Sequence, residues 1–162
     1  MAINVGDKLP DATFTVMGPD GPGPQTTQDV FGGKKAVLFA VPGAFTPTCS
    51  KQHLPGFVAN ADKIKGKGID TIACTSVNDV FVLDAWSKDA GADGKVTMLA
   101  DGSADFTKAL GLELDMVARG LGVRSQRYAM IVEDGVVSAL HVEDGPGSTE
   151  KSGADTIAAL LD

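Results

Sequence analysis

The chain has little cysteine, little histidine and little positive charge. Its 162 residues include two cysteines, two histidines, one tryptophan and one tyrosine, and its formal net charge is −7. Two cysteines cannot build the disulfide framework of a small secreted protein, and cysteines and histidines at positions 49, 53, 74 and 141 lack zinc-site spacing. The negative charge argues against nucleic acid or an anionic membrane surface as the main partner, because both select clustered Lys and Arg.

Long apolar runs are also missing. No stretch approaches the roughly 20 residues that cross a bilayer. The first fourteen residues lack the charged start and apolar core of a signal peptide. We therefore expect no membrane partner and a reducing compartment, either the cytoplasm or an organelle if a transit peptide has been removed. The length fits one domain over residues 1–162, with no metal or organic cofactor indicated.

Strands and helices alternate along most of the chain. Continuous apolar runs predict buried strands at residues 34–41, 69–77 and 95–100. Apolar residues at helical spacing predict one helix that starts near Leu54 and another that follows Asn78 as its N-cap. Strand–helix–strand units of this kind give parallel strands with right-handed crossovers.

The C-terminal part adds a hairpin and a last helix. Residues 127–143 read as two strands around an Asp-Gly pair, a strong turn signal, and a helix with Ser152 as N-cap follows. Two segments show no clear periodicity. We expect a turn-rich loop at residues 18–27 and a functional or interface loop at residues 110–126. The order of elements predicts an α/β fold with a mixed central β-sheet flanked by helices.

One of the cysteines stands at the start of a predicted helix. In VPGAFTPTCSKQHLPGF (residues 41–57), Pro42 ends a strand, Thr46 fits an N-cap and Pro47 fits the first helical position. Cys49 then lies in the first turn of a helix at the carboxyl end of a parallel strand, where ligands gather in open α/β sheets. The unpaired N–H groups and the dipole of a helix start favour thiolate over thiol.

Thr46 has two uses at this position. Its oxygen can accept a helix N–H while its O–H donates to the sulfur or to a bound oxygen. The plain alternative is that Cys49 is a small core residue, as most free cysteines are. A core cysteine has no need of a capped helix start at a strand end, so we favour an activated thiol.

The other thiol and the histidines have simpler interpretations. His53 shares a helical face with Cys49, but no orienting acid is evident for a Cys–His nucleophilic pair, so a packing or hydrogen-bonding role is favoured. Cys74 could resolve an oxidised Cys49 as a disulfide only if the two Cα atoms lie within about 7 Å, and an inert buried thiol is favoured. His141 reads as a strand residue, and Trp86 as a core residue.

The motif PGAFTPTCS at residues 42–50 resembles the peroxidatic motif of peroxiredoxins, P-x-x-x-T-x-x-C, and the longer segment resembles their type II, or peroxiredoxin-5-like, branch. Further similar segments, in order, are VGDKLPDATF, GKKAVLFAVPG, SVNDVFVLDAW, LADGSADFTKALGLELD and RSQRYAMIVEDG. Because the resemblance covers nearly the whole chain, it is far more specific than one motif. It implies a thioredoxin-like fold, in agreement with the order of elements.

The resemblance also implies roles for single residues. Cys49 takes the position of the peroxidatic nucleophile, Thr46 that of the hydroxyl that aligns the peroxide, and Pro42 that of the shield over the sulfur. Arg127, rather than the nearby Arg124, takes the position of the arginine that stabilises the thiolate and the charge passing along S–O–O. By this resemblance Cys49 attacks H2O2 or an alkyl hydroperoxide and becomes a sulfenic acid, without a cofactor.

The recycling step differs from that of some relatives, which carry a resolving cysteine in the tail. Residues 145–153 contain none. We therefore expect an external thiol to reduce Cys49, either glutathione with glutaredoxin or thioredoxin. The resemblance further implies a homodimer, with Leu121 in the 110–126 segment as a candidate contact.

Two other functions remain as alternatives. One is a thioredoxin-like signalling or chaperone module in which oxidation of Cys49 controls partner binding. A disulfide reductase of the thioredoxin kind is disfavoured, because CSKQ lacks the second cysteine of C-x-x-C.

Overall fold

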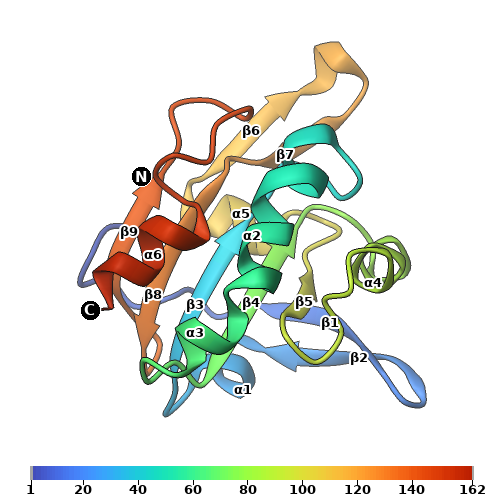
Figure 1. The fold of residues 1–162 in the computed structure, drawn as a ribbon. Helices are drawn as coiled ribbons and strands as arrows, with labels where there is room; N and C mark the ends of the chain where they lie inside the picture. The colour runs from blue at the N-terminus through green and yellow to red at the C-terminus, as the bar shows by residue number, and fades with distance from the viewer. Residues whose placement is uncertain (1, 162) are drawn as a thin grey trace.

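The structure, a computed structural model, describes residues 2–161, and its centre is a seven-stranded sheet in the order β2-β1-β5-β4-β3-β8-β9 (Figure 1). The middle strands, which run parallel to one another, are β3 (Lys35–Ala40), β4 (Thr71–Ser76) and β5 (Thr97–Ala100). Next to β3 lies β8 (Tyr128–Glu133), antiparallel to it, and next to β8 lies β9 (Val136–Val142), antiparallel in turn. The predicted mixed α/β sheet is confirmed.

The middle strands are apolar because both faces of the sheet are covered. Every residue of β3 after Lys35 and every residue of β4 after Thr71 is buried. Strands of this kind read as continuous apolar runs rather than as alternating patterns, which is why the three runs predict them correctly.

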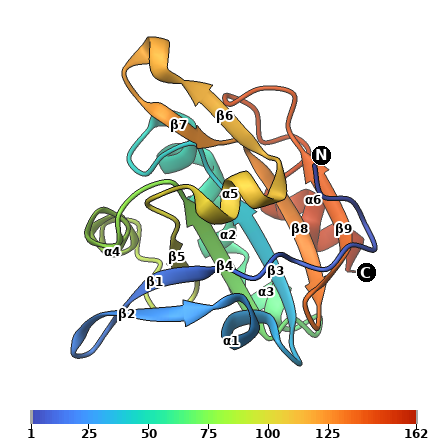
Figure 2. The same ribbon diagram turned by 180° about the vertical axis from the view of Figure 1, so that it is seen from behind.

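Helices cover both faces of the sheet (Figures 1 and 2). On one face lie α2 (Leu54–Ala59), α3 (Ala61–Lys65), α4 (Val80–Asp89) and α6 (Ala154–Leu160). On the other face lie α1 (Thr27–Phe31) and α5 (Asp105–Leu110).

Each face of the sheet has its own apolar core. The first core contains Trp86, which is 1% exposed as predicted for a core residue, and the stacked rings of Phe39 and Phe57, with centroids 4.1 Å apart. The second contains Phe14 and Phe106, whose rings meet edge to face at 4.8 Å. Because both cores rest on the same central strands, the ends of those strands are held from both sides.

The two segments expected to be loops belong to β-hairpins instead, and residues 18–27 supply the turn and second strand of the first one. β1 (Thr13–Gly18) and β2 (Gly21–Thr26) pair with each other at the edge of the main sheet. The sequence of β2, GPGPQT, hides this strand, because Gly weakens strands and Pro is accepted mainly in edge strands, where its missing N–H leaves no ladder bond unmade.

The second hairpin stands apart from the main sheet and projects beyond it at the top of Figure 1. It consists of β6 (Glu113–Met116), a 3₁₀ turn η2 (Val117–Arg119) and β7 (Gly122–Ser125). Most of its residues are exposed or half-buried, so the segment lacks the buried apolar pattern that sequence analysis relies on.

Two predicted helix caps are wrong by one residue. Asp79, not Asn78, caps α4, because its side chain accepts the Val82 N–H at 2.9 Å. Gly153, not Ser152, is the N-cap of α6. Asn78 and Ser152 both bind other segments near the candidate site, which sequence analysis of single helices does not detect.

Within residues 2–161 no helix has the length and the apolar character needed to cross a bilayer.

Candidate active site

The loop after β3 is held in place by side chains from two other segments of the chain. Asn78, just beyond β4, accepts the Ala44 N–H through its side-chain oxygen at 2.9 Å. Arg124 of β7 donates to the carbonyl oxygen of Pro42 at 3.5 Å and to that of Val77 at 3.3 Å. Phe45 adopts a positive φ of 63°, which is rare outside glycine. The loop that leads to Cys49 is therefore a fixed turn.

A helix follows this loop, and Cys49 lies in its first turn as predicted. Pro47 and Thr48 are helical, and Cys49–His53 form the π-helical turn η1, closed by a bond from the Leu54 N–H to the Cys49 carbonyl. Single π turns inside helices often mark functional sites.

Thr46 stands at the start of this helix as predicted, but its side chain makes a different hydrogen bond from the predicted one. Its backbone carbonyl accepts the Ser50 N–H at 2.9 Å, but its hydroxyl donates to the Gly43 carbonyl at 2.7 Å instead of accepting a helix N–H. The predicted side-chain cap is wrong, because the tight turn brings the Gly43 carbonyl within reach of the hydroxyl. The bond fixes the direction of the hydroxyl.

Arg127 reaches Cys49 from the strand β8 side of the sheet. Its Nη2 donates to the Cys49 sulfur at 2.9 Å, and its Nη1 donates to Nδ1 of His53 at 2.8 Å. Its Nε and Nη2 both donate to the Pro146 carbonyl, at 3.1 and 3.0 Å. Arg127 is only 2% exposed and Cys49 is fully buried. The guanidinium therefore places a fixed positive charge and a hydrogen-bond donor directly on the buried sulfur.

His53 is a buried hydrogen-bonding residue, as the sequence favoured, and its partner is Arg127. Since an arginine can only donate, Nδ1 of His53 accepts, so Nε2 carries the proton and donates to the Ser152 carbonyl at 2.9 Å. Burial, with a smaller contribution from the Arg127 charge, lowers the pKa of His53 from 6.5 to about 3. The imidazole is therefore neutral at physiological pH and adds no positive charge beside the sulfur.

Cys74 is buried in the middle of β4, where it pairs with Phe39 and Met98 of the adjacent strands. Burial raises the pKa of the Cys74 thiol well above its usual range, and the charge of Cys49 raises it further. Since the thiolate is the reactive form of cysteine, this environment disfavours reaction at Cys74.

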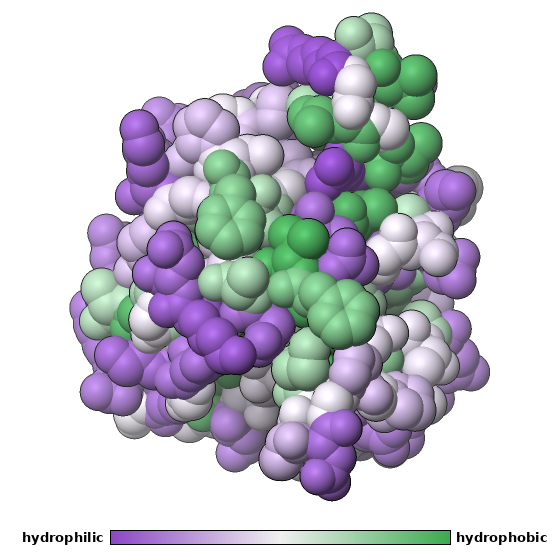
Figure 3. All heavy atoms as spheres, turned by 90° about the vertical axis from the view of Figure 1, so that its right-hand side faces the viewer, coloured by the Kyte–Doolittle hydropathy of each residue, from purple (hydrophilic) through white to green (hydrophobic). Residues whose placement is uncertain are grey.

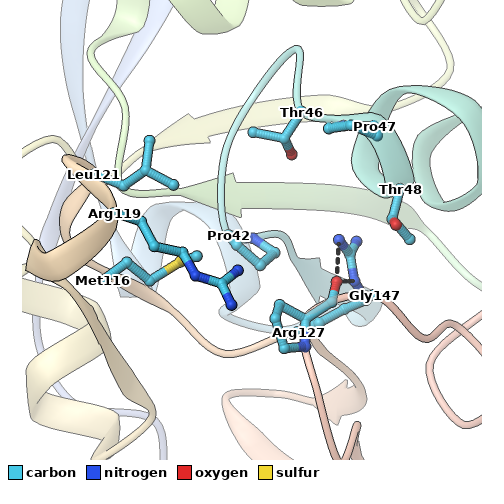
Figure 4. A pocket seen from close by; sticks show the side chains of 10 residues that line it. Pro42, Thr46, Pro47, Thr48, Met116, Arg119, Leu121, Arg127 and Gly147 are labelled. Carbon is cyan, nitrogen blue, oxygen red and sulfur yellow. Dashed lines mark hydrogen bonds between the residues drawn. The ribbon is translucent and has the colours of Figure 1, made fainter.

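A cavity of about 260 Å³ opens beside this cluster (Figure 4). Pro42, Thr46 and Arg127 line it together, and the dashed lines in Figure 4 mark the bonds from Arg127 to the Pro146 carbonyl. The other lining residues are Pro47, Thr48, Met116, Arg119, Leu121, Pro146 and Gly147.

The structure thus brings together the four residues singled out by the sequence: Cys49, Thr46, Arg127 and Pro42. Met116 and Arg119 escaped prediction because they come from the 110–126 segment, for which the sequence predicts a functional or interface loop without assigning a role to either residue. Leu121 of the same hairpin lines the cavity.

Comparisons with known proteins agree with this geometry. The redoxin family model matches residues 4–157. The chain is 51% identical to the chloroplastic peroxiredoxin-2E of Arabidopsis thaliana over 163 residues, which cover 98% of this chain and 70% of that protein. The chain belongs to the type II peroxiredoxins.

Solved structures of peroxiredoxins share the fold. Reduced Prx3 of Vibrio vulnificus in complex with H2O2 is 53% identical, with a TM-score of 0.94 and coverage of 99% of both chains. A 1-Cys peroxiredoxin of Plasmodium falciparum is 27% identical, with a TM-score of 0.88 and 98% coverage of each chain. The thioredoxin-like fold is confirmed. This peroxiredoxin is a thiol-dependent peroxidase, as the sequence predicted.

The pKa of His53 predicts a pH dependence of stability. Below about pH 6.5 the unfolded chain binds a proton at His53 that the folded chain does not bind until about pH 3, so the free energy of unfolding falls as the pH falls through this window. His53 alone should contribute a slope approaching about 1.4 kcal/mol per pH unit. Chemical denaturation of the wild type and of His53→Gln between about pH 6 and 4 measures it. The slope should be shallower in the variant, and equal slopes would contradict the prediction.

Proposed function

We propose that Cys49 is the peroxidatic nucleophile and that it reduces H2O2 and alkyl hydroperoxides. The observation that carries the proposal is the 2.9 Å bond from Arg127 to the Cys49 sulfur, next to a cavity lined by Pro42 and Thr46. A module that only binds partners has no need of a buried cation on its sulfur, so this bond favours peroxidase chemistry over the signalling or chaperone alternative.

The reaction is a displacement at oxygen. The Cys49 thiolate bonds to the terminal oxygen of the hydroperoxide, the O–O bond breaks, and hydroxide or alkoxide leaves and takes up a proton from solvent. The sulfur is oxidised to sulfenic acid as the peroxide is reduced to water or an alcohol. Arg127 stabilises the negative charge as it passes from sulfur to the leaving oxygen.

Thr46 and Pro42 act on the approaching peroxide. The Thr46 hydroxyl proton is engaged by Gly43, which leaves lone pairs on its oxygen to accept a peroxide O–H and align it with the sulfur. Pro42 offers no N–H, and in this proposal its apolar ring, which lines the cavity, shields the sulfur. The apolar groups of Met116 and Leu121 around the cavity suit alkyl hydroperoxides as well as H2O2.

An external thiol returns Cys49 to its reduced state in this proposal. Residues 145–153 contain no cysteine, and Cys74 is held as a buried thiol. Glutathione with glutaredoxin is our first candidate for the reductant and thioredoxin the second. Both belong to a reducing compartment, so we place the enzyme in the cytoplasm or in an organelle, as in the relatives named chloroplastic.

We also propose that the chain works as one domain. Both apolar cores rest on one sheet, and the redoxin family model covers residues 4–157.

A homodimer completes the proposal. Apolar side chains gather on the face that carries α4 and the β6–β7 hairpin (Figure 3). The large exposed ones from these elements and the active-site loop are Phe81 at 65%, Val117 at 62% and Phe45 at 51%. Apolar surface of this kind marks protein–protein contacts, and a second copy of the chain would cover it.

Substitutions test the assigned roles in steady-state peroxidase assays coupled to glutaredoxin and to thioredoxin. Cys49→Ser should abolish turnover, and Arg127→Ala should lower kcat/KM by about 10²–10³-fold because the transition-state charge loses its donor. Cys74→Ser, the matched control, should keep most of the activity. Full activity of Cys49→Ser would refute the proposal.

One equivalent of peroxide distinguishes the two recycling routes. If recycling depends on an external thiol, the chain treated with peroxide alone should lose one free thiol and gain about 16 Da as a sulfenic acid. Loss of both thiols with a decrease of about 2 Da within one chain would show a Cys49–Cys74 disulfide instead. Thiol titration and intact-mass spectrometry of the same sample provide both measurements.

Light scattering tests the dimer. The wild type should scatter as twice the chain mass of 16.6 kDa. Phe81→Glu should shift the population toward monomer, because a charge would be buried in the interface. Val5→Glu, at an exposed valine of the N-terminal segment, is the matched control and should remain dimeric. A monomeric wild type at micromolar concentration would contradict the dimer.

A further inference from the structure

One loop holds Arg127 directly, through Pro146, and indirectly, through His53. The segment between β9 and α6, residues 143–153, has no regular secondary structure. Within it, the Pro146 carbonyl accepts two N–H bonds from Arg127. The Ser152 carbonyl accepts from His53, whose other nitrogen accepts from Arg127. The position of the guanidinium therefore depends on the conformation of this loop.

Glu143 closes the loop with its side chain. One carboxylate oxygen accepts three bonds from the far end of the segment: the Lys151 N–H at 2.9 Å, the Ser152 N–H at 2.6 Å and the Ser152 hydroxyl at 2.6 Å. At the near end, the Glu143 N–H donates to the Arg127 carbonyl at 2.9 Å. Glu143 is only 7% exposed. A buried carboxylate with this many donors is bound tightly, since bonds to a charged acceptor are the strong ones.

We propose that Glu143 is a positioning residue for peroxide reduction. By closing the 143–152 loop, it places the Pro146 and Ser152 carbonyls so that Arg127 and His53 are held against Cys49. This inference rests on the roles proposed above for Cys49 and Arg127.

The physical reason is the entropy of an irregular segment. Ten residues without a helix or strand ladder have many conformations, and each fixed residue costs about 1–2 kcal/mol of backbone entropy. Without the carboxylate, the two N–H groups and the hydroxyl at the far end lose their acceptor. The loop would then populate several conformations, because fewer bonds offset the entropy of ordering it. Arg127 would then keep its bond to Cys49 only part of the time, and the resting thiolate and the transition state would both lose stabilisation.

The test compares three single variants with the wild type. Glu143→Ala removes the acceptor. Glu143→Gln keeps the length of the side chain and one acceptor oxygen for the same three donors. Asp144→Asn is the matched control, because its carboxylate is 91% exposed and contacts only the Lys151 ammonium among the described bonds.

Two readouts are taken on each folded enzyme. The first is the second-order rate of Cys49 oxidation by H2O2. The second is the ultraviolet absorbance of the Cys49 thiolate, taken as the difference from Cys49→Ser, at neutral and at alkaline pH. A role limited to overall stability would not change the second readout.

We expect Glu143→Ala to slow Cys49 oxidation by about tenfold to a hundredfold, since a misplacement of about 1 Å at a reacting centre can cost that much. Its thiolate absorbance should fall at neutral pH and match the wild type at alkaline pH. Glu143→Gln should recover most of both losses, and Asp144→Asn should behave as the wild type. A folded Glu143→Ala enzyme with wild-type rate and absorbance would overturn the inference, and so would a slower rate with unchanged absorbance.

Two further variants make the result decisive. If Glu143→Ala does not fold, Ser152→Ala removes one of the three bonds, and it should show a smaller loss in both readouts; wild-type values would overturn the inference. Arg127→Ala separates this inference from the proposed function. If Arg127→Ala leaves both readouts unchanged, the proposed function fails, whereas a loss in Arg127→Ala with none in Glu143→Ala refutes only the role of Glu143.

Discussion

The bond between the Arg127 guanidinium and the Cys49 sulfur is the interaction on which the rest of the site depends. A buried arginine without an acceptor would be costly, and the Cys49 sulfur is one of the acceptors that make the burial of Arg127 tolerable. The pair lies beside the cavity that Pro42, Thr46 and Arg127 line. His53 supports the pair without competing with it, because its low pKa keeps the imidazole neutral and therefore able to accept from Arg127.

The fold brings these residues together although 78 positions separate them. β3 and β8 are antiparallel neighbours, and their register pairs Ala40 with Tyr128. The chain leaving β3 therefore passes the point where it enters β8, which places Arg127 beside the turn that starts at Pro42. The antiparallel pairing of β3 with β8 thus brings the helix that holds Cys49 and the start of β8, next to Arg127, to the same end of the sheet.

Much of this architecture could be predicted from the sequence, and each failure has a physical cause. The buried central strands and the β8–β9 turn were correct because burial on both faces and an Asp-Gly turn leave strong local patterns. The β1–β2 hairpin was missed because an edge strand tolerates Pro and Gly, and the β6–β7 hairpin because it is largely exposed. Asn78 and Ser152 were assigned as caps since such residues usually cap helices, yet both serve distant segments.

The sequence by itself determined that Cys49 stands in the first turn of a helix after a buried strand, since Pro, Thr and apolar periodicity act over a few residues. Through its resemblance to peroxiredoxins it also selected Arg127. Only the tertiary structure decided how Arg127 is held, because its supports come from His53 on the cysteine helix and from the loop closed by Glu143. These contacts link residues far apart in the chain, and their geometry depends on strand register and loop closure, which no local pattern encodes.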